Sequence, residues 1–517
     1  MAQASCRLTD AVETRQTACR SAGVSALAFS RRGARRPPDS AWYNGGFLNA
    51  DEHYQIIEFA QYKLGRQAAS SLAWEFAARM RPAFQPWIAA GAIRLADAIG
   101  VTSPFAIAFA LRVVSTLLAM WVSFELSVRA LRGVESQMLK TVALSASFFF
   151  WLTPTVHGRF ASENWGAALL VAGLCLMLDA ADCRPDRVAR SVLLATCAGL
   201  TWSVAFYCRF QIGASIAGAA LWLLVIRRAR VSLILMIAAS FAVGCALNEV
   251  LDHWLYGVWT FVPYNYFAVN LVQGKAATFG TAPWWMILVY FAVVLIPPYS
   301  LIVIAVVAAG CWYARRALLV WTMVPFVVLH TLVGHKEARF LMPMLYFIGP
   351  LAAVSIEALP SGLRGALVAA SRTLPGRVTV LSAFTINVLL LCVAMFVPAN
   401  DTYRLDRWLW EQGRHGDVTL YSLDASLGRA PDSFTDTFYV SRHVVVSRVQ
   451  TLGQLRAAAS HGSALVYYLG FDPPGLVDAV GVCTPILRTF PVWLARLAWF
   501  ATPLSVHIGT VCRVSTS

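Results

Sequence analysis

Long uninterrupted runs of apolar residues constrain this chain more than any other feature of its sequence. About ten of them follow residue 103, and most approach the roughly 20 residues that a helix needs to cross a bilayer core about 30 Å thick. Hydrophobic residues make up 58% of the 517 residues and charged ones only 13%, a balance that soluble domains do not show. We therefore predict an all-α polytopic membrane protein with spans at 104–127, 141–156, 164–182, 191–207, 210–226, 231–249, 284–312, 317–333, 341–357 and 378–398.

The run at 284–312 is longer than one span requires and contains Pro297 and Pro298 near its middle. Proline removes a backbone donor and clashes with the preceding helical turn. We expect a kink or a break in the helix at this point.

Lys and Arg are distributed unevenly between the loops on the two sides of these spans. One set of loops contains fourteen, namely Arg129, Arg132, Lys140, Arg184, Arg187, Arg190, Arg227, Arg228, Arg230, Arg315, Arg316, Arg364, Arg372 and Arg377. The opposite short loops contain five: Arg159, Arg209, Lys275, Lys336 and Arg339. Because cytoplasmic loops accumulate positive charge, we assign the first set to the cytoplasm. Residues 49–103, the loop at 251–283 and the part after residue 400 then face the opposite, exofacial side.

Three parts are expected along the chain. Residues 1–45 contain no apolar run that could cross a membrane and are typical of a disordered tail. Residues 46–400 form the transmembrane domain. Residues 401–517 form a small exofacial α/β domain, with strands expected at 418–423, 438–449 and 464–471 and a helix at 452–459.

Charge distribution and cysteine spacing make nucleic-acid binding and metal binding unexpected for this chain. The net charge of +15 comes from short clusters between apolar runs and not from one basic face, so nucleic-acid binding is not expected. The eleven cysteines include no C-x-x-C pair, and no metal site is expected. An exofacial location of the last part would permit a disulfide between Cys483 and Cys512.

The few exofacial cations lie in polar clusters at the span ends. These clusters are HGRFASEN (157–164), CRFQ (208–211) and GHKEARF (334–340). A single Arg at a helix end more often extends to lipid headgroups. In the third cluster, however, a His, two cations and a carboxylate occur within a few residues, which favours a site for a lipid phosphate.

Carboxylates gather in the first exofacial segment, which reads DEHYQIIE (51–58) and then WEFAARMRP (74–82). Transfer of a sugar to a hydroxyl requires a base, and a carboxylate in a partly dehydrated site can act as one. Asp51 and Glu52 are the candidates. The alternative is a solvated helix N-terminus, where acidic residues are common.

The loop at 251–285 is rich in Trp, Tyr, Phe and Asn. Aromatic rings at this position anchor membrane interfaces, and rings with amide partners also bind sugars. Interface anchoring accounts for the rings but not for Asp252, Asn265 and Asn270 among them.

These segments occur in an order that resembles the GT-C mannosyltransferases of glycosyltransferase family 22, and within that family the members that add the third mannose of GPI anchors. HKEARF (335–340) matches the His-Lys-Glu-x-Arg-Phe motif of the family. The acidic segment resembles its first lumenal loop, GRFASEN (158–164) resembles its Arg-containing span boundary, and LYGVW with YNYFAVN and FGTAPWW resembles its large lumenal loop. The resemblance extends over residues 49–399. Relatives have a transmembrane helix directly before the acidic loop, and residues 1–45 do not contain one of ordinary length.

The resemblance implies a GT-C fold and inverting transfer of mannose, or a similar hexose, from a polyprenyl- or dolichyl-phosphate donor to a lipid-linked or glycan acceptor, without cofactor or metal. By motif, Asp51 would be the base, with Glu52 as its neighbour or substitute. The donor phosphate would be held by Arg209, His335, Lys336 and Arg339. Substrate contacts are expected from Glu75, Arg81, Arg159, Asn265, Asn270 and Glu337.

The active site would face the endoplasmic reticulum lumen in a eukaryote or the periplasm in a bacterium. The alternative is a secondary transporter or lipid flippase, in which charged groups lie at the bilayer midplane within repeated halves. The sequence shows no internal repeat, but Arg112 and Glu125 do lie within a predicted span.

Overall fold

The computed structural model describes residues 45–400, 402–423, 437–441, 443–460, 463–469, 474–478, 480–489 and 509–515. The prediction of a disordered tail at 1–45 lies outside the described residues, apart from Gly45. The predicted domain boundary between residues 400 and 401 stays a prediction.

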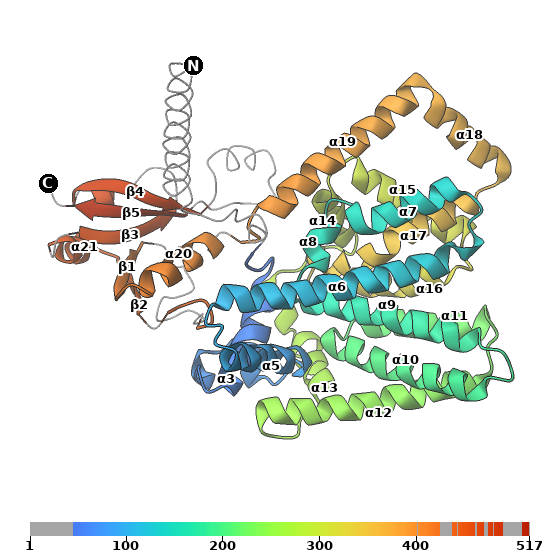
Figure 1. Cartoon of the computed structure of the whole chain (residues 1–517), viewed down its shortest axis with the longest axis horizontal. Helices are drawn as coiled ribbons and strands as arrows, with labels where there is room; N and C mark the ends of the chain where they lie inside the picture. Colours follow the sequence, from blue (N-terminus) through green and yellow to red (C-terminus); the bar gives the residue numbers. More distant parts are fainter. Residues whose placement is uncertain are drawn as a thin grey trace, which may run out of the picture. The chain divides into compact units, whose positions relative to one another are not determined.

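Most of the described chain is helical, which confirms the predicted class (Figure 1). Six helical segments are long and apolar enough to span a membrane, and α15 (Tyr299–Tyr313) and α16 (Leu318–Leu332), bent by 117° at their junction, could count as a seventh. The six are α6 (Pro104–Ala130) with the turn that follows it, α9 (Ser162–Ala181), α10 (Val188–Cys208), α12 (Val231–Tyr256), Ala338–Glu357, which joins η7 (Ala338–Met344) to α17 (Leu345–Glu357), and α19 (Leu374–Phe396).

The expectation of about ten spans was therefore too high for the residues described. Three predicted spans are shorter helices: α7 (Gln137–Phe149), α11 (Ile212–Val225) and α14 (Met286–Leu295). The run at 141–156 is divided because Phe150 is extended and Pro154 begins the separate helix α8 (Thr153–His157). The break expected at Pro297 and Pro298 is confirmed, since α14 ends before these prolines and α15 begins after them.

Small residues let the helices approach one another closely. A Cβ atom added to Gly173 of α9 would lie 2.3 Å from the ring of Trp202 of α10. The Trp202 indole in turn donates a hydrogen bond to the Leu170 carbonyl at 3.1 Å. A Cβ added to Gly199 of α10 would likewise lie 2.4 Å from the carbonyl oxygen of Ile237 in α12. Backbone approach of this kind is the usual way for helices to associate within a bilayer, and α9, α10 and α12 run alongside one another (Figure 1).

The acidic segment folds into short helices: α2 (Ala50–Glu52), the π-helix η2 (His53–Ile57), α3 (Glu58–Lys63), η3 (Ala69–Ser71) and α4 (Trp74–Ala77), followed by α5 (Phe84–Ala98). The buried carboxylate of Asp252, near the end of α12, accepts a hydrogen bond from the backbone N–H of Ala83 at 2.7 Å. This bond fixes the start of α5 against α12. The large loop contains α13 (Val262–Phe267), the π-helix η5 (Ala268–Val272) and η6 (Lys275–Phe279).

The last part of the chain is a five-stranded sheet with the order β2-β1-β3-β5-β4. The predicted strands appear as β1 (Val418–Ser422), β2 (Val444–Arg448) and β3 (Ser463–Leu469), of which β2 begins six residues later than expected. β1 is parallel to both β2 and β3, whereas β5 (Gly509–Ser515) is antiparallel to β3 and β4 (Val482–Arg488). β4 and β5 were not predicted, and a disulfide joins Cys483 of β4 to Cys512 of β5.

Helices cover both faces of this sheet. Leu405 and Leu409 of α20 (Tyr403–Gly413) pack on one face against Leu420. Leu455 and Ala459 of α21 (Leu452–Ala459), which matches the predicted helix, pack on the other. The predicted small α/β fold is confirmed.

The loops assigned to opposite sides of the membrane lie at opposite ends of the helices. At the end assigned to the cytoplasm, Arg129 of α6 pairs with Asp179 of α9 at 2.7 Å. At the same end Asp182 pairs with Arg132 at 3.6 Å and with Arg227 at 2.5 Å. The predicted exofacial clusters meet at the other end, where the site described next is formed.

Candidate active site

Asp51 lies in the first turn of α2. Asn49 caps this helix, because its side-chain oxygen accepts a hydrogen bond from the Asp51 backbone N–H at 2.9 Å. The Asp51 carboxylate accepts a hydrogen bond from Gln55 Nε2 at 2.8 Å and pairs with Nη2 of Arg339 at 2.9 Å. These partners hold the carboxylate at the edge of the cavity that it lines.

Arg339 is the centre of a charge network. In addition to the contact just described, its guanidinium pairs with Glu337 at 2.6 Å and with Glu163 at 3.5 Å. Glu163, in the first turn of α9, also pairs with Arg209 at 2.9 Å. Phe340 lies beneath both guanidinium groups, with its ring centroid 5.3 Å from the guanidinium carbon of Arg209 and 5.6 Å from that of Arg339. The two cations are therefore held side by side by the protein itself.

A second group extends the network toward the large loop. Arg81 lies 3.6 Å from a carboxylate oxygen of Glu75 and 3.9 Å from one of Asp51. Gln55 Nε2 joins the two acids, since it also donates to Glu75 at 2.9 Å. The Arg81 guanidinium lies 5.6 Å from the ring centroid of Tyr266. Burial raises the pKa of Glu75, and the positive charge of Arg81 opposes this shift.

These groups surround a cavity of about 760 Å³. Its wall combines charged side chains with aromatic ones, a composition typical of ligand pockets. Of the residues predicted from the sequence, eight line it: Asp51, Glu75, Arg81, Arg209, Asn270, His335, Glu337 and Arg339. The aromatic side chains are those of Tyr54, Trp74, Phe206, Phe210, Tyr266, Phe267, Phe279 and Phe340.

His335 stands at the cavity wall between two oxygen acceptors. Its Nε2 lies 3.0 Å from Oε1 of Glu337 and its Nδ1 lies 3.0 Å from the carbonyl oxygen of Gly280. Burial acts to raise the pKa of Glu337, but the hydrogen bond and the positive charge of Arg339 outweigh it, so the pKa lies below its ordinary value. Glu337 is therefore ionised at neutral pH.

Lys336 does not line the cavity. Its ammonium group donates to the carbonyls of His330 at 3.2 Å, Thr331 at 3.0 Å and also Val333, at the C-terminal end of α16. Carbonyls at a helix C-terminus lack partners within the helix, and a cation is favourable there. The role predicted for Lys336 in binding phosphate stays a prediction, and in this structure the side chain caps a helix.

The two asparagines of the large loop occupy different places. Asn270 lines the cavity from η5. Asn265 donates to the carbonyl of Arg79 at 3.1 Å and to the Thr260 hydroxyl at 2.8 Å. Asn265 thus connects the loop to the acidic segment that contains Arg79.

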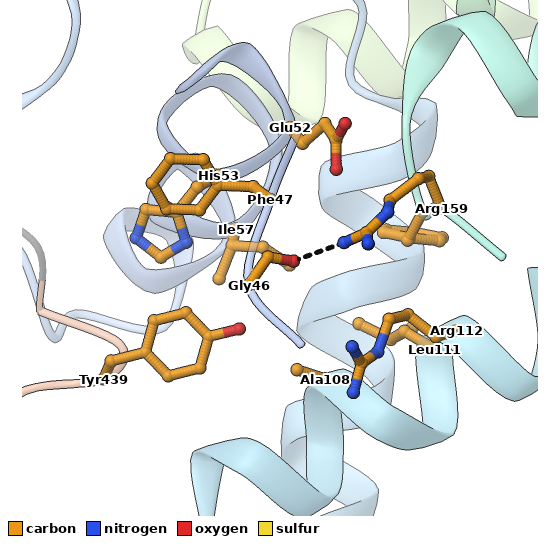
Figure 2. A pocket seen from close by; sticks show the side chains of 11 residues that line it. Gly46, Phe47, Glu52, His53, Ile57, Ala108, Leu111, Arg112, Arg159 and Tyr439 are labelled. Atoms are coloured by element: carbon orange, nitrogen blue, oxygen red, sulfur yellow. Dashed lines mark hydrogen bonds between the residues drawn. The ribbon is translucent and has the colours of Figure 1, made fainter. Parts of the chain in front are cut away.

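Glu52 lines a separate small pocket of about 40 Å³ (Figure 2). There its carboxylate faces the guanidinium of Arg159, which donates to the Gly46 carbonyl at 2.8 Å. Burial raises the pKa of Glu52 to about 7, although the positive charge of Arg159 opposes the shift. Burial likewise lowers the pKa of Arg159 to about 10, and the negative charge of Glu52 opposes that shift. Of the two adjacent acids, only Asp51 lines the large cavity.

Glu58, the first residue of α3 and the one directly after η2, binds a segment from the last part of the chain. Its carboxylate accepts hydrogen bonds from the Thr437 backbone N–H at 3.0 Å, the Thr437 hydroxyl at 2.6 Å and the Phe438 N–H at 3.1 Å. His53 Nε2 lies 2.9 Å from the same carboxylate, and both side chains are almost fully buried. The helix that carries Asp51 is thereby attached at its far end.

Sequence reasoning missed three residues with direct roles in this geometry. Gln55 lies within DEHYQIIE and Glu163 within HGRFASEN, two motifs that the sequence analysis identified. Membership in these motifs could have identified both residues, whereas their residue types alone could not. Lys275 was noted only as a loop cation, but it lines the cavity with its ammonium 5.1 Å from the ring centroid of Trp74.

Two solved structures are similar to this chain over most of its length. ArnT from Cupriavidus metallidurans, in its structure bound to undecaprenyl phosphate, matches with a TM-score of 0.49 and 13% identity over 92% of this chain and 96% of that chain. The archaeal oligosaccharyltransferase AglB from Archaeoglobus fulgidus, in complex with an inhibitory peptide and a dolichol-phosphate, matches with a TM-score of 0.45 and 12% identity over 73% of this chain and 58% of that chain.

Curated relatives are similar in sequence. GPI mannosyltransferase 3 from Yarrowia lipolytica is 24% identical over 333 residues, which cover 62% of this chain and 61% of that protein. GPI alpha-1,2-mannosyltransferase 3 from Mus musculus is 30% identical over 125 residues, 24% of this chain and 22% of that protein. The chain thus matches less than two thirds of the length of these relatives.

A family model matches most of the chain. The model of the Alg9-like mannosyltransferase family matches residues 40–403, which include every residue of the charge network and of the cavity wall. The match confirms the resemblance that HKEARF and the acidic segment indicated. The protein belongs to the Alg9-like mannosyltransferase family.

Proposed function

We propose that this protein is an inverting glycosyltransferase that moves mannose, or a similar hexose, from a polyprenyl- or dolichyl-phosphate carrier to a hydroxyl group of a lipid-linked or glycan acceptor. The observation that carries the proposal is the cavity in which a carboxylate lies beside paired guanidinium groups. Family membership supports the choice of mannose. The acceptor is a glycolipid or glycan, because the aromatic wall suits a sugar and the cavity opens at one end of the helices.

The carrier phosphate would bind Arg339, Arg209 and His335. In this structure the two guanidiniums are neutralised by Asp51, Glu163 and Glu337. A phosphate that approaches Arg339 competes with Asp51 for the same N–H donors. Binding of the donor therefore weakens the contact between Arg339 and the Asp51 carboxylate, which becomes available as a base at the moment when the donor is in place.

The chemical step follows from this arrangement. The acceptor oxygen attacks the anomeric carbon from the side opposite the carrier, while Asp51 accepts the hydroxyl proton. The bond between the anomeric carbon and the phosphate oxygen breaks, and its electron pair leaves with the carrier phosphate. The fixed guanidiniums stabilise this developing charge without reorganisation, and such preorganised electrostatic stabilisation usually contributes most of the rate enhancement. Attack from the opposite side inverts the configuration.

Glu52 is the second candidate for the base, and pH dependence separates the two. A base must be deprotonated, so if Glu52 served, the transfer rate would fall as the pH drops below about 7, the pKa of this buried carboxyl. Its position outside the large cavity favours a positioning role instead, in which its charge acts on Arg159 at the wall of the small pocket.

The site is proposed to face away from the cytoplasm. The cavity lies at the end of the helices whose loops are poor in Lys and Arg, and the disulfide between Cys483 and Cys512 suits an oxidising compartment. The secondary transporter and the lipid flippase are disfavoured by family membership.

The test is sugar transfer by purified protein in vesicles supplied with polyprenyl-phosphate-mannose and a glycolipid acceptor. Asp51→Asn should lower turnover by about 1,000-fold or more, since it removes the base. Asp97→Asn is the matched control: Asp97 lies in α5 of the same segment, is half exposed and, among the described residues, pairs with Arg66. Equal activity of the two variants would remove Asp51 from the mechanism. Solute transport without any glycosylated product would favour the rival function.

A further inference from the structure

A second cavity, of about 430 Å³, lies at the end of the helices assigned to the cytoplasm. It is formed where the α9–α10 loop (182–187) meets the α11–α12 loop (226–230). Four arginines line it: Arg184, Arg227, Arg228 and Arg230. It shares no lining residue with the cavity that contains Asp51.

Most of these arginines are not paired with a carboxylate among the described residues. Arg227 pairs with Asp182 at 2.5 Å, and the same carboxylate group is shared with Arg132 at 3.6 Å. Among the residues that the structure describes, no carboxylate lies within ion-pairing distance of Arg184, Arg228 or Arg230. Three exposed guanidiniums around one cavity generate a positive potential that an anion would relieve.

Two helices also begin at this cavity. α10 begins after Arg187 and α12 begins after Arg230, and neither N-terminus receives a side-chain cap. The first backbone N–H groups of a helix have no acceptors within the helix, and the helix dipole favours an anion there. The arginines and the helix ends thus favour the same kind of ligand.

The remaining wall of the cavity is apolar. Val188 and Val192 of α10, with Leu233 and Met236 of α12, continue from the arginines along the helices. A free inorganic anion would make no use of this wall. A molecule with a phosphate at one end and an alkyl chain at the other would use both parts.

We propose that this cavity binds the phosphate group of an anionic membrane lipid, with the headgroup at Arg184, Arg228 and Arg230 and one acyl chain along α10 and α12. Clusters of cations at the cytoplasmic ends of membrane helices attract anionic lipids in this way. The ligand is bound at the face opposite the proposed site of sugar transfer.

The proposal is tested by binding to the purified full-length chain, so its outcome does not depend on transferase activity. Delipidated protein in detergent is titrated separately with phosphatidylglycerol, phosphatidylcholine and inorganic phosphate. The number of bound ligand molecules is measured in each case by native mass spectrometry. We expect saturable binding of phosphatidylglycerol at least about tenfold tighter than of the other two ligands. Equal binding of phosphatidylcholine would overturn the assignment of an anionic ligand, and equal binding of phosphate would overturn the assignment of a lipid.

Two double variants locate the site. Arg184→Gln with Arg230→Gln should weaken phosphatidylglycerol binding by about tenfold or more. Arg315→Gln with Arg316→Gln removes the same charge from exposed arginines between α15 and α16, outside the cavity, and should leave binding within about twofold of the unmodified protein. Equal weakening in both would mean diffuse attraction to a basic surface and would refute the site.

A third variant distinguishes loss of a direct phosphate contact from misfolding of the protein. Arg184→Lys with Arg230→Lys keeps the charge but removes the planar fork that binds phosphate through two hydrogen bonds. It should lose about threefold in affinity while its thermal unfolding remains unchanged. Undiminished binding by this variant would contradict direct contact between these guanidiniums and the phosphate.

Discussion

The two cavities, at opposite ends of the helices, differ in how their arginines are paired. At the end with the large cavity, Arg339 contacts three carboxylates and Arg209 contacts one of them, and the side chains are mostly buried. At the other end Arg184, Arg228 and Arg230 are exposed and face no carboxylate among the described residues. Charges that are paired within a wall have fixed positions, which suits catalysis, whereas unpaired exposed charges attract an anion without fixing its geometry.

Among the tests of this comparison, the largest effect is expected at the centre of the paired end, the end where Arg339 and Arg209 contact carboxylates. Arg339→Gln leaves Asp51, Glu163 and Glu337 without their shared cation and removes a donor to the leaving phosphate. We expect kcat/KM for sugar transfer to fall by about 100-fold or more. The matched control is Arg364→Gln, which removes an arginine paired with Glu357 at the opposite end and should change kcat/KM by less than about twofold.

Glu163→Gln tests whether the ion pairs around Arg339 and Arg209 stabilise the fold as well as position the side chains for catalysis. The substitution leaves Arg209 without its carboxylate partner in a buried setting, where losing one member of a pair is costly. We expect the free energy of unfolding to drop by about 3 kcal/mol and transfer to fall by at least about tenfold. Thermal unfolding in detergent and initial rates measure the two effects. A loss of activity without loss of stability would show that Glu163 contributes only by positioning Arg209 and Arg339.

Glu52→Gln tests how the stability of the protein depends on pH through this one buried carboxyl group. The pKa of Glu52 is raised in the folded chain from 4.5 to about 7, so the folded state holds its proton more tightly than the unfolded state. Its contribution to stability is greatest below pH 4.5 and is lost as the pH rises toward about 7. The unmodified protein should therefore lose about 1–3 kcal/mol relative to Glu52→Gln between pH 5 and pH 8. Parallel stability curves for the two proteins would contradict a raised pKa.

The smallest effect is expected at the opposite end. Arg129 and Asp179 form a half-buried pair, for which a double-mutant cycle with Arg129→Gln and Asp179→Asn should give a coupling of about 1 kcal/mol. Transfer kinetics should not change, because neither side chain lines the cavity. A large change in turnover would mean that the two ends are coupled.

Much of the candidate site was accessible from the sequence because its chemistry is concentrated in short motifs. HKEARF supplies Arg339, His335 and Glu337, and the acidic segment supplies Asp51. The charge bias between loops also predicted which motifs would share one end of the helices. Motifs record residue types, however, and they do not record where each side chain points.

The sequence alone therefore determined the membrane class, the family, which loops gather at each end of the helices and most of the charged residues that line the cavity. Tertiary structure decided the rest: that Lys336 caps α16, that only Asp51 of the adjacent Asp51 and Glu52 lines the large cavity, and that Gln55 joins two acids distant in the sequence. The physical reason is that composition selects the solvent and the chemistry, whereas the direction of a side chain depends on partners far away along the chain. Only the packed helices bring those partners within hydrogen-bonding distance.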